Sequence, residues 1–257
     1  VDLESIEKIV RLIEATSSQI VIHTAGLASV ERCESDPQLA HHLNVTLAGN
    51  VAKACAMARV TLIHISTDHL FSGEDSFVNE NQPVSPVNVY GKTKAAAEDL
   101  VLEVNPNSLV IRTNFFGWGT SYRQSLSDII IGALRAGSDL KLFQDVFFTP
   151  ILIEHLAFAV HDLLAIKASG IFNVVGDECV SKNEFGLKIA QEFGLDLTRI
   201  KSGLIKDTNL VRRPRDMSLS NQKVCNLLGR QLGNIDQHLV RLHEQELNVQ
   251  TQLIRAL

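Results

Sequence analysis

Apolar residues in the first half of the chain follow two spacings. A spacing of three to four residues from Leu3 to Ile13 predicts an amphipathic helix over about residues 3–15. Short apolar runs at 19–23, 61–66 and 108–112 predict strands that are buried on both faces. Between them, one long helix is predicted after the N-cap pair Asp36-Pro37 and another over about 88–104. Strands that alternate with helices in this way form right-handed βαβ units, so we expect a parallel sheet.

The pattern is less regular after residue 115. It predicts helices at 121–136, 153–167, 182–194, 221–228 and 235–248, and strands at 140–143 and 171–175. Ser181 and Glu184 have the spacing of a capping box. We expect residues 1–118 to form a sheet domain on which 145–170 pack, and residues 119–144 and 171–257 to form a smaller lobe. A ligand cleft would lie between the two, beyond the carboxyl ends of the strands.

Composition excludes several classes of protein. The 257 residues are 45% hydrophobic and 21% charged, as in a globular chain. The formal net charge of −5 argues against nucleic acid and against an anionic membrane surface as the main partner. No apolar run approaches the roughly 18 residues of a membrane span. The four cysteines are scattered, without metal-ligand spacing, so we expect buried thiols in a reducing compartment, the cytoplasm, and no metal site.

A tyrosine and a lysine supply the first candidate chemistry. Tyr90 and Lys94 are four residues apart at the start of a predicted helix and therefore share a face. A nearby ammonium would lower the pKa of the phenol, which could then protonate a carbonyl oxygen near neutral pH. This pair is common by chance, but here Thr67 ends the preceding strand, where its hydroxyl could bind the same carbonyl. Together the three residues predict a catalytic site.

At this point the sequence resembles the extended short-chain dehydrogenase/reductase family, in its dTDP-4-dehydrorhamnose reductase branch. The matching stretches are His23–Gly26, Ser66–Phe71, Ser85–Lys94, Arg112–Phe115, Phe148–Pro150 and Arg213–Leu219. They follow the family order and cover nearly the whole chain. The resemblance implies a Rossmann-like, doubly wound parallel α/β sheet with a smaller C-terminal α/β substrate lobe. The family's glycine-rich turn is absent from the sequence, so we expect the N-terminal strands of the sheet to precede Val1.

The resemblance also implies roles for single residues. Tyr90 would protonate a C4 ketone oxygen while NADPH or NADH delivers hydride, Thr67 would orient the ketone, and Lys94 would bind the nicotinamide ribose. Further contacts would come from residues that bind the cofactor, namely Asp2, Leu3, Thr24, Ala25 and Gly26, and from residues that bind the substrate, namely Asp68 and Phe115. The branch usually has Trp where Phe115 stands.

Four residues keep two interpretations each. Asn44 could hold a proton-relay water, as in the family, or could be an ordinary polar helix residue. Arg213 and Arg215 could bind a diphosphate or could form salt bridges. Trp118, between two glycines, could line the cleft or lie in a loop without a role in binding.

The leading hypothesis is therefore a reductase of a 4-keto-6-deoxy sugar nucleotide that functions in polysaccharide synthesis and could form a homodimer. A second hypothesis is a non-catalytic, NADP-binding relative that resembles the regulatory subunit of methionine adenosyltransferase. A third is an inactive fragment whose sheet exposes an unpaired edge.

Overall fold

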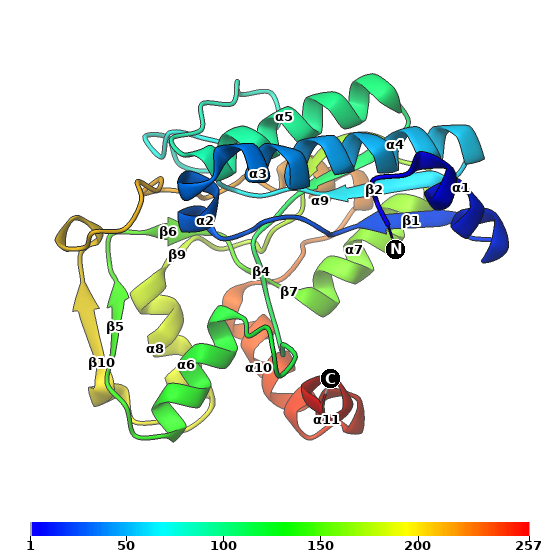
Figure 1. Cartoon of the computed structure of the whole chain (residues 1–257). Helices are drawn as coiled ribbons and strands as arrows, with labels where there is room; N and C mark the ends of the chain where they lie inside the picture. The colour runs from blue at the N-terminus through cyan, green and yellow to red at the C-terminus, as the bar shows by residue number, and fades with distance from the viewer. Residues whose placement is uncertain (1, 257) are drawn as a thin grey trace.

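The computed structural model describes residues 2–256 and confirms a Rossmann-like parallel sheet (Figure 1). Four strands are adjacent in the order β1 (Ile20–His23), β2 (Thr61–Ile65), β3 (Leu109–Arg112) and β8 (Gly170–Asn173). All three pairings are parallel. Strand β1 forms one edge of the sheet in the described part of the chain.

Helices cover both faces of this sheet. The helices α1 (Ile6–Ala15), α4 (Leu47–Ala58) and α5 (Val89–Val104) pack with Leu62 and Val110 on one face. The helices α7 (Ile153–Ala165) and α9 (Gln222–Leu228) pack with Ile63, Leu109 and Ile111 on the other. Alternate residues of β2 and β3 thus enter opposite cores, which explains why the apolar runs are continuous. Full burial of each such side chain contributes about 1.5–3 kcal/mol.

The long helix predicted after Pro37 is divided. It consists of α3 (Pro37–His41), a π-helical turn (His42–Thr46) and α4, and it is preceded by a short helix, α2 (Val30–Ser35). The Asp36 carboxylate caps α3 by accepting a hydrogen bond of 2.9 Å from Leu39 N. Single π-helical turns within α-helices often occur at functional sites, and this one carries Asn44.

The C-terminal lobe has its own apolar core. Its elements are α6 (Leu126–Arg135), β5 (Leu140–Phe143), α8 (Lys182–Glu192), β10 (Ile200–Gly203), α10 (Ile235–Glu246) and α11 (Val249–Ala256). Strands β5 and β10 pair in parallel. The Ser181 hydroxyl caps α8 by accepting from Glu184 N at 3.0 Å, which is one of the two hydrogen bonds of the predicted capping box. Phe148 and Phe185 are fully buried at the centre of this core.

Short strand pairs connect the lobe to the sheet domain. Strand β4 (Phe115–Phe116) pairs with β7 (Ile151–Leu152), and β6 (Phe147–Phe148) pairs with β9 (Val180–Ser181). A basic loop reaches back to the sheet domain, where Asn88 Nδ2 donates to Arg212 O at 2.9 Å. The lobe is therefore anchored over the carboxyl ends of the parallel strands, where the cleft was expected.

One part of the expected lobe belongs to the sheet. Residues 171–257 were assigned to the lobe, but β8 pairs with β3 in the main sheet and α9 packs on β8. The reason is that the apolar run of β8 fills the open hydrogen-bonding edge of β3, a partner that a local sequence pattern does not identify. Within residues 2–256, no helix combines the length and the apolar character that crossing a bilayer would require.

Candidate active site

The end of strand β2 carries Thr67 and Asp68 into the interior, where they are 5% and 2% exposed. The Thr67 hydroxyl donates to Asp68 Oδ1 at 3.2 Å, and Asn114 Nδ2 donates to Asp68 Oδ2 at 2.5 Å. Asn114 follows β3, the neighbouring strand, so both side chains emerge at the same edge of the sheet. The Asp68 carboxylate thus fixes the position of Thr67. Asn114 could have been predicted from the sequence, because it closely follows a predicted parallel strand.

Tyr90 lies in the first turn of α5 beside this group. Asn88 caps the helix by accepting from Gly91 N at 2.8 Å, and the His69 ring packs edge-on against Tyr90 with 5.4 Å between the ring centroids. Burial raises the pKa of Tyr90 to about 12, against the opposite effect of a hydrogen bond with the Thr67 side chain. The structure therefore brings Thr67 and Tyr90 together, as predicted, and the phenol keeps its proton at neutral pH.

The predicted effect of Lys94 on Tyr90 is wrong in this structure. The Lys94 ammonium is turned away toward strand β2, where it donates to Ile65 O at 2.7 Å and lies 3.4 Å from His64 Nε2. Burial lowers the pKa of Lys94 itself to about 8, partly opposed by the charge of Glu98. The helical spacing places both residues on one face, but the direction of a long side chain depends on its acceptors.

Asn44 clamps the turn that follows strand β1. Its Oδ1 accepts from Leu27 N at 2.6 Å, and its Nδ2 donates to Leu27 O at 3.1 Å and to Thr93 Oγ1 at 2.9 Å. The amide thus ties the 24–26 turn to α5, a structural role that uses both ends of the side chain. A Cβ added at Gly26 would lie 2.8 Å from Asn44 Oδ1, so this clamp requires a glycine.

We expect Gly26→Ala to destabilise the protein by about 1–3 kcal/mol, the usual cost of an added methyl in a packed site. Asn44 has to move away from the new Cβ, and its bonds to Leu27 are then lost. Thermal unfolding measures the effect. Gly132→Ala is the matched control, because among the described residues no atom outside the backbone of its own helix lies within 4 Å of its added Cβ, and alanine favours the α6 helix. Equal melting temperatures for the two variants would contradict the clamp.

Three of the residues predicted to bind a cofactor line a groove beside β1. Leu3, Thr24 and Ala25 line one largely apolar groove of about 550 Å³, together with His23. Asp2 is separate, since its carboxylate accepts from Glu4 N and pairs with Lys8 Nζ at 2.9 Å. The residues at the end of β1 are small, which suits close approach of the nicotinamide ribose of a dinucleotide. Lys94 has one further N–H beyond those that contact His64 Nε2 and Ile65 O, and this N–H could bind the ribose. The glycine-rich turn that binds the phosphates of a dinucleotide in this fold does not occur in the sequence.

A second cavity, of about 280 Å³, opens beside His69 and lies between the sheet domain and the lobe. The charged residues in its lining are all basic: Lys141, Lys182 and Arg213. The Lys182 ammonium lies 3.1 Å from the centroid of the Phe148 ring and has no acceptor partner among the described residues. His69 Nδ1 and Arg213 Nε are likewise buried without hydrogen-bond partners in that part of the chain. Lys182 and Arg213 supply the positive charge of this lining, whereas burial lowers the pKa of His69.

The remaining residues of the lining are apolar, namely Leu126, Leu142, Phe143, Val146, Ile205 and Met217. The cavity can thus receive a ligand with an anionic and an apolar part. Lys182 and His69 were not predicted to line a site, because no local pattern distinguishes either of them from an ordinary exposed side chain.

The remaining candidates have less direct roles. Arg213 pairs with Glu31 of α2, in agreement with the salt-bridge interpretation, and it also lines the cavity, so the diphosphate interpretation stays a prediction. Arg215 is 68% exposed in its side chain and lies 3.8 Å from Asp145, which favours the salt-bridge interpretation. Phe115 is 48% exposed and directly follows Asn114, and its predicted contact with the substrate stays a prediction.

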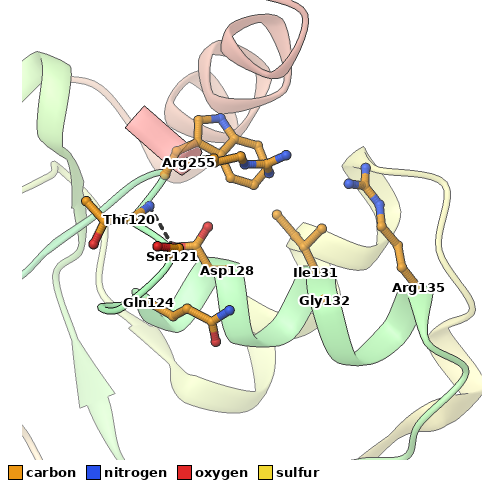
Figure 2. A pocket seen from close by; sticks show the side chains of 10 residues that line it. Thr120, Ser121, Gln124, Asp128, Ile131, Gly132, Arg135 and Arg255 are labelled. Carbon is orange, nitrogen blue, oxygen red and sulfur yellow. Dashed lines mark hydrogen bonds between the residues drawn. The ribbon is translucent and has the colours of Figure 1, made fainter. Parts of the chain in front are cut away.

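Trp118 lines a different cavity, which lies between α6 and the C-terminal helix α11 (Figure 2). The Arg255 guanidinium stacks 3.9 Å from the centroid of its ring, and its indole N–H donates to Leu242 O at 3.1 Å. In Figure 2, Asp128 and Ile131 point from α6 toward Arg255. None of the predicted catalytic residues lines this cavity, so the cleft interpretation of Trp118 is not supported.

The described residues include no group of three or more His, Cys, Asp or Glu side chains that could hold a metal ion. The four cysteines are all free thiols.

Comparison with known proteins agrees with this geometry. The model of the RmlD substrate binding domain family matches residues 1–247. A probable low-salt glycan biosynthesis reductase of Haloferax volcanii is 33% identical over 237 residues, which are 89% of this chain and 78% of that protein. Methionine adenosyltransferase 2 subunit beta of Rattus norvegicus is 28% identical over 235 residues, 87% of this chain and 69% of that protein.

The fold is also that of solved structures. A dTDP-4-dehydrorhamnose reductase from Bacillus anthracis, in complex with NADP, superimposes with a TM-score of 0.88 at 22% identity, over 95% of this chain and 87% of that one. The resemblance seen in the sequence is thereby confirmed, and the chain belongs to the RmlD substrate binding domain family.

Proposed function

We propose that the protein is an NAD(P)H-dependent oxidoreductase that reduces the ketone of a 4-keto-6-deoxy sugar nucleotide, such as dTDP-4-dehydrorhamnose. The observation that carries this proposal is the group formed by Thr67 and Tyr90 beside a cavity that is lined by basic and apolar side chains. The family membership and the NADP-bound structural relative support the same reaction and cofactor.

In this reaction the bound nicotinamide supplies a hydride to the carbonyl carbon, and the protein supplies the proton. A phenol with a pKa of about 12 gives its proton only to a strongly basic oxygen, such as the alkoxide that develops during hydride addition. Tyr90 therefore protonates the oxygen as charge accumulates there. Thr67, held by Asp68, positions this oxygen next to the phenol.

The cavity beside His69 would hold the nucleotide. Its cations, Lys182 and Arg213, would bind the diphosphate, and Phe143 and Met217 would pack against the base. An ammonium without a hydrogen-bond acceptor among the described residues, in a largely apolar cavity, attracts such a ligand more strongly than an exposed one, because the local dielectric constant is lower.

We expect Lys182→Met to raise the KM for the sugar nucleotide by about 10- to 100-fold, in line with the loss of a hydrogen bond to a charged group. The value of kcat should change little, since Lys182 contacts the part of the substrate that does not react. Steady-state kinetics measure both. Lys188→Met on the same helix is the control, because Lys188 pairs with Asp236 outside the cavity. A normal KM in Lys182→Met would place the diphosphate elsewhere.

The test of the function is direct. Purified protein is mixed with NADPH or NADH and dTDP-4-dehydrorhamnose, and absorbance at the reduced-nicotinamide band is followed. Turnover that depends on the keto sugar supports the proposal, whereas its absence with both cofactors overturns it.

A non-catalytic regulatory subunit is the second candidate, supported by the similarity to the methionine adenosyltransferase subunit. It predicts nucleotide binding without turnover and co-purification with an adenosyltransferase.

We further propose a cytoplasmic location, which the free thiols support.

A further inference from the structure

Two buried histidines connect Lys94 with the groove along β1. His23 and His64 are register partners on strands β1 and β2, and they are 5% and 1% exposed. Their rings stack with 5.3 Å between the centroids, and their Nδ1 atoms are 3.1 Å apart. His64 Nε2 lies 3.4 Å from Lys94 Nζ, while His23 Nε2 is buried without a hydrogen-bond partner within residues 2–256. His23, His64 and Lys94 therefore form a continuous series of side-chain contacts.

The order of donors and acceptors in this chain follows from chemistry. A lysine ammonium has only donors, so His64 Nε2 must accept from Lys94. A neutral imidazole carries one proton, which in His64 must then be on Nδ1 and is donated to His23 Nδ1. The proton of His23 is therefore on Nε2. Burial, together with the positive charge of Lys94, lowers the pKa of both histidines, that of His23 to about 4, so both rings are neutral at pH 7.

Few charges act on this group. Lys94 reaches it from α5, and Glu98 lies one turn further along the same helix with its carboxylate paired to Arg112. The Lys94 ammonium has three N–H bonds, of which Ile65 O and His64 Nε2 occupy two. One N–H remains for a ligand.

We propose that His64 is a positioning residue for Lys94: it and Ile65 O hold the ammonium so that a single N–H is left for the cofactor, and His23 acts behind it by fixing the tautomer of His64. The inference rests on the proposed function, because it takes Lys94 as the residue that binds the nicotinamide ribose. The geometry of the three side chains does not depend on which keto sugar is reduced.

Nitrogen-15 NMR of the wild-type histidines tests the tautomers without activity and without a variant. We expect His64 as the Nδ1–H form and His23 as the Nε2–H form between pH 6 and 8. The opposite tautomer of His64, or a charged ring in this range, would overturn the proposal.

Variants test the consequence for Lys94 through NADPH binding, followed by nicotinamide fluorescence against pH. We expect His64→Leu to weaken NADPH binding about tenfold at pH 7. We also expect the pH above which NADPH binding is lost to fall, because the pKa of Lys94, about 8 in the wild type, becomes lower in the variant. The sign follows because an ammonium that loses an acceptor while buried deprotonates more easily. His64→Gln, whose amide oxygen accepts from Lys94, should restore binding to within about threefold.

His23→Asn should behave like the wild type, because its amide oxygen accepts the Nδ1 proton of His64, and exposed His41→Leu is the control. Equal binding by His64→Leu and His64→Gln, both folded by circular dichroism, would refute the positioning role. Neither NMR nor cofactor binding needs turnover, so failure of the proposed reductase reaction leaves both results interpretable.

Discussion

Replacing Tyr90 by phenylalanine is expected to lower kcat for ketone reduction by about 10²- to 10⁴-fold, the usual contribution of a positioned acid. The variant lacks the hydroxyl that we propose as the proton donor to the developing alkoxide but keeps the ring that packs against His69. Initial rates of NADPH oxidation at saturating keto sugar measure the loss. The affinity for NADPH and the melting temperature should stay close to those of the wild type.

The chain provides a matched control, because Tyr122 is the second of its two tyrosines and is 80% exposed. Tyr122→Phe makes the same chemical change outside the site and should retain full activity. If Tyr90→Phe turned over as fast as Tyr122→Phe, Tyr90 would not be the acid, and the proposed mechanism would be wrong.

The second large effect is expected at a buried ion pair behind the site. Glu98 of α5 and Arg112 of β3 are each 3% exposed in their side chains, and Arg112 Nη2 donates to Glu98 Oε2 at 2.7 Å while its Nε also donates to both oxygens at 3.1 Å. Glu98→Ala leaves the guanidinium buried without its counter-charge. We expect a loss of about 3–5 kcal/mol in the free energy of unfolding, measured by denaturant titration.

Two further variants separate the charge from the packing. Glu103→Ala removes an exposed carboxylate from the same helix and should cost less than about 1 kcal/mol. The double variant Glu98→Leu/Arg112→Leu removes both charges and should be more stable than Glu98→Ala, because no charge remains buried alone. A Glu98→Ala protein as stable as Glu103→Ala would show that the pair does not support the sheet.

The candidate site could be predicted only in part. Thr67 and Tyr90 were found because a strand end and a helix start are local features, and parallel strands bring their carboxyl ends together. Lys182 and His69 were missed because the cavity that they line forms only when the lobe packs over the sheet. The pKa of Tyr90 was predicted in the wrong direction, since burial and the acceptors around Lys94 decide it.

The alternation of strands and helices and the parallel sheet follow from the amino-acid sequence, because apolar spacing is set by neighbours within a few residues. Three features follow from the folded arrangement instead: β8 pairs with β3, Lys94 turns to His64 and Ile65, and Asn44 serves as a clamp. Each of these depends on a partner distant in sequence, such as His64 for Lys94, whose position follows from packing and hydrogen bonding across the whole fold.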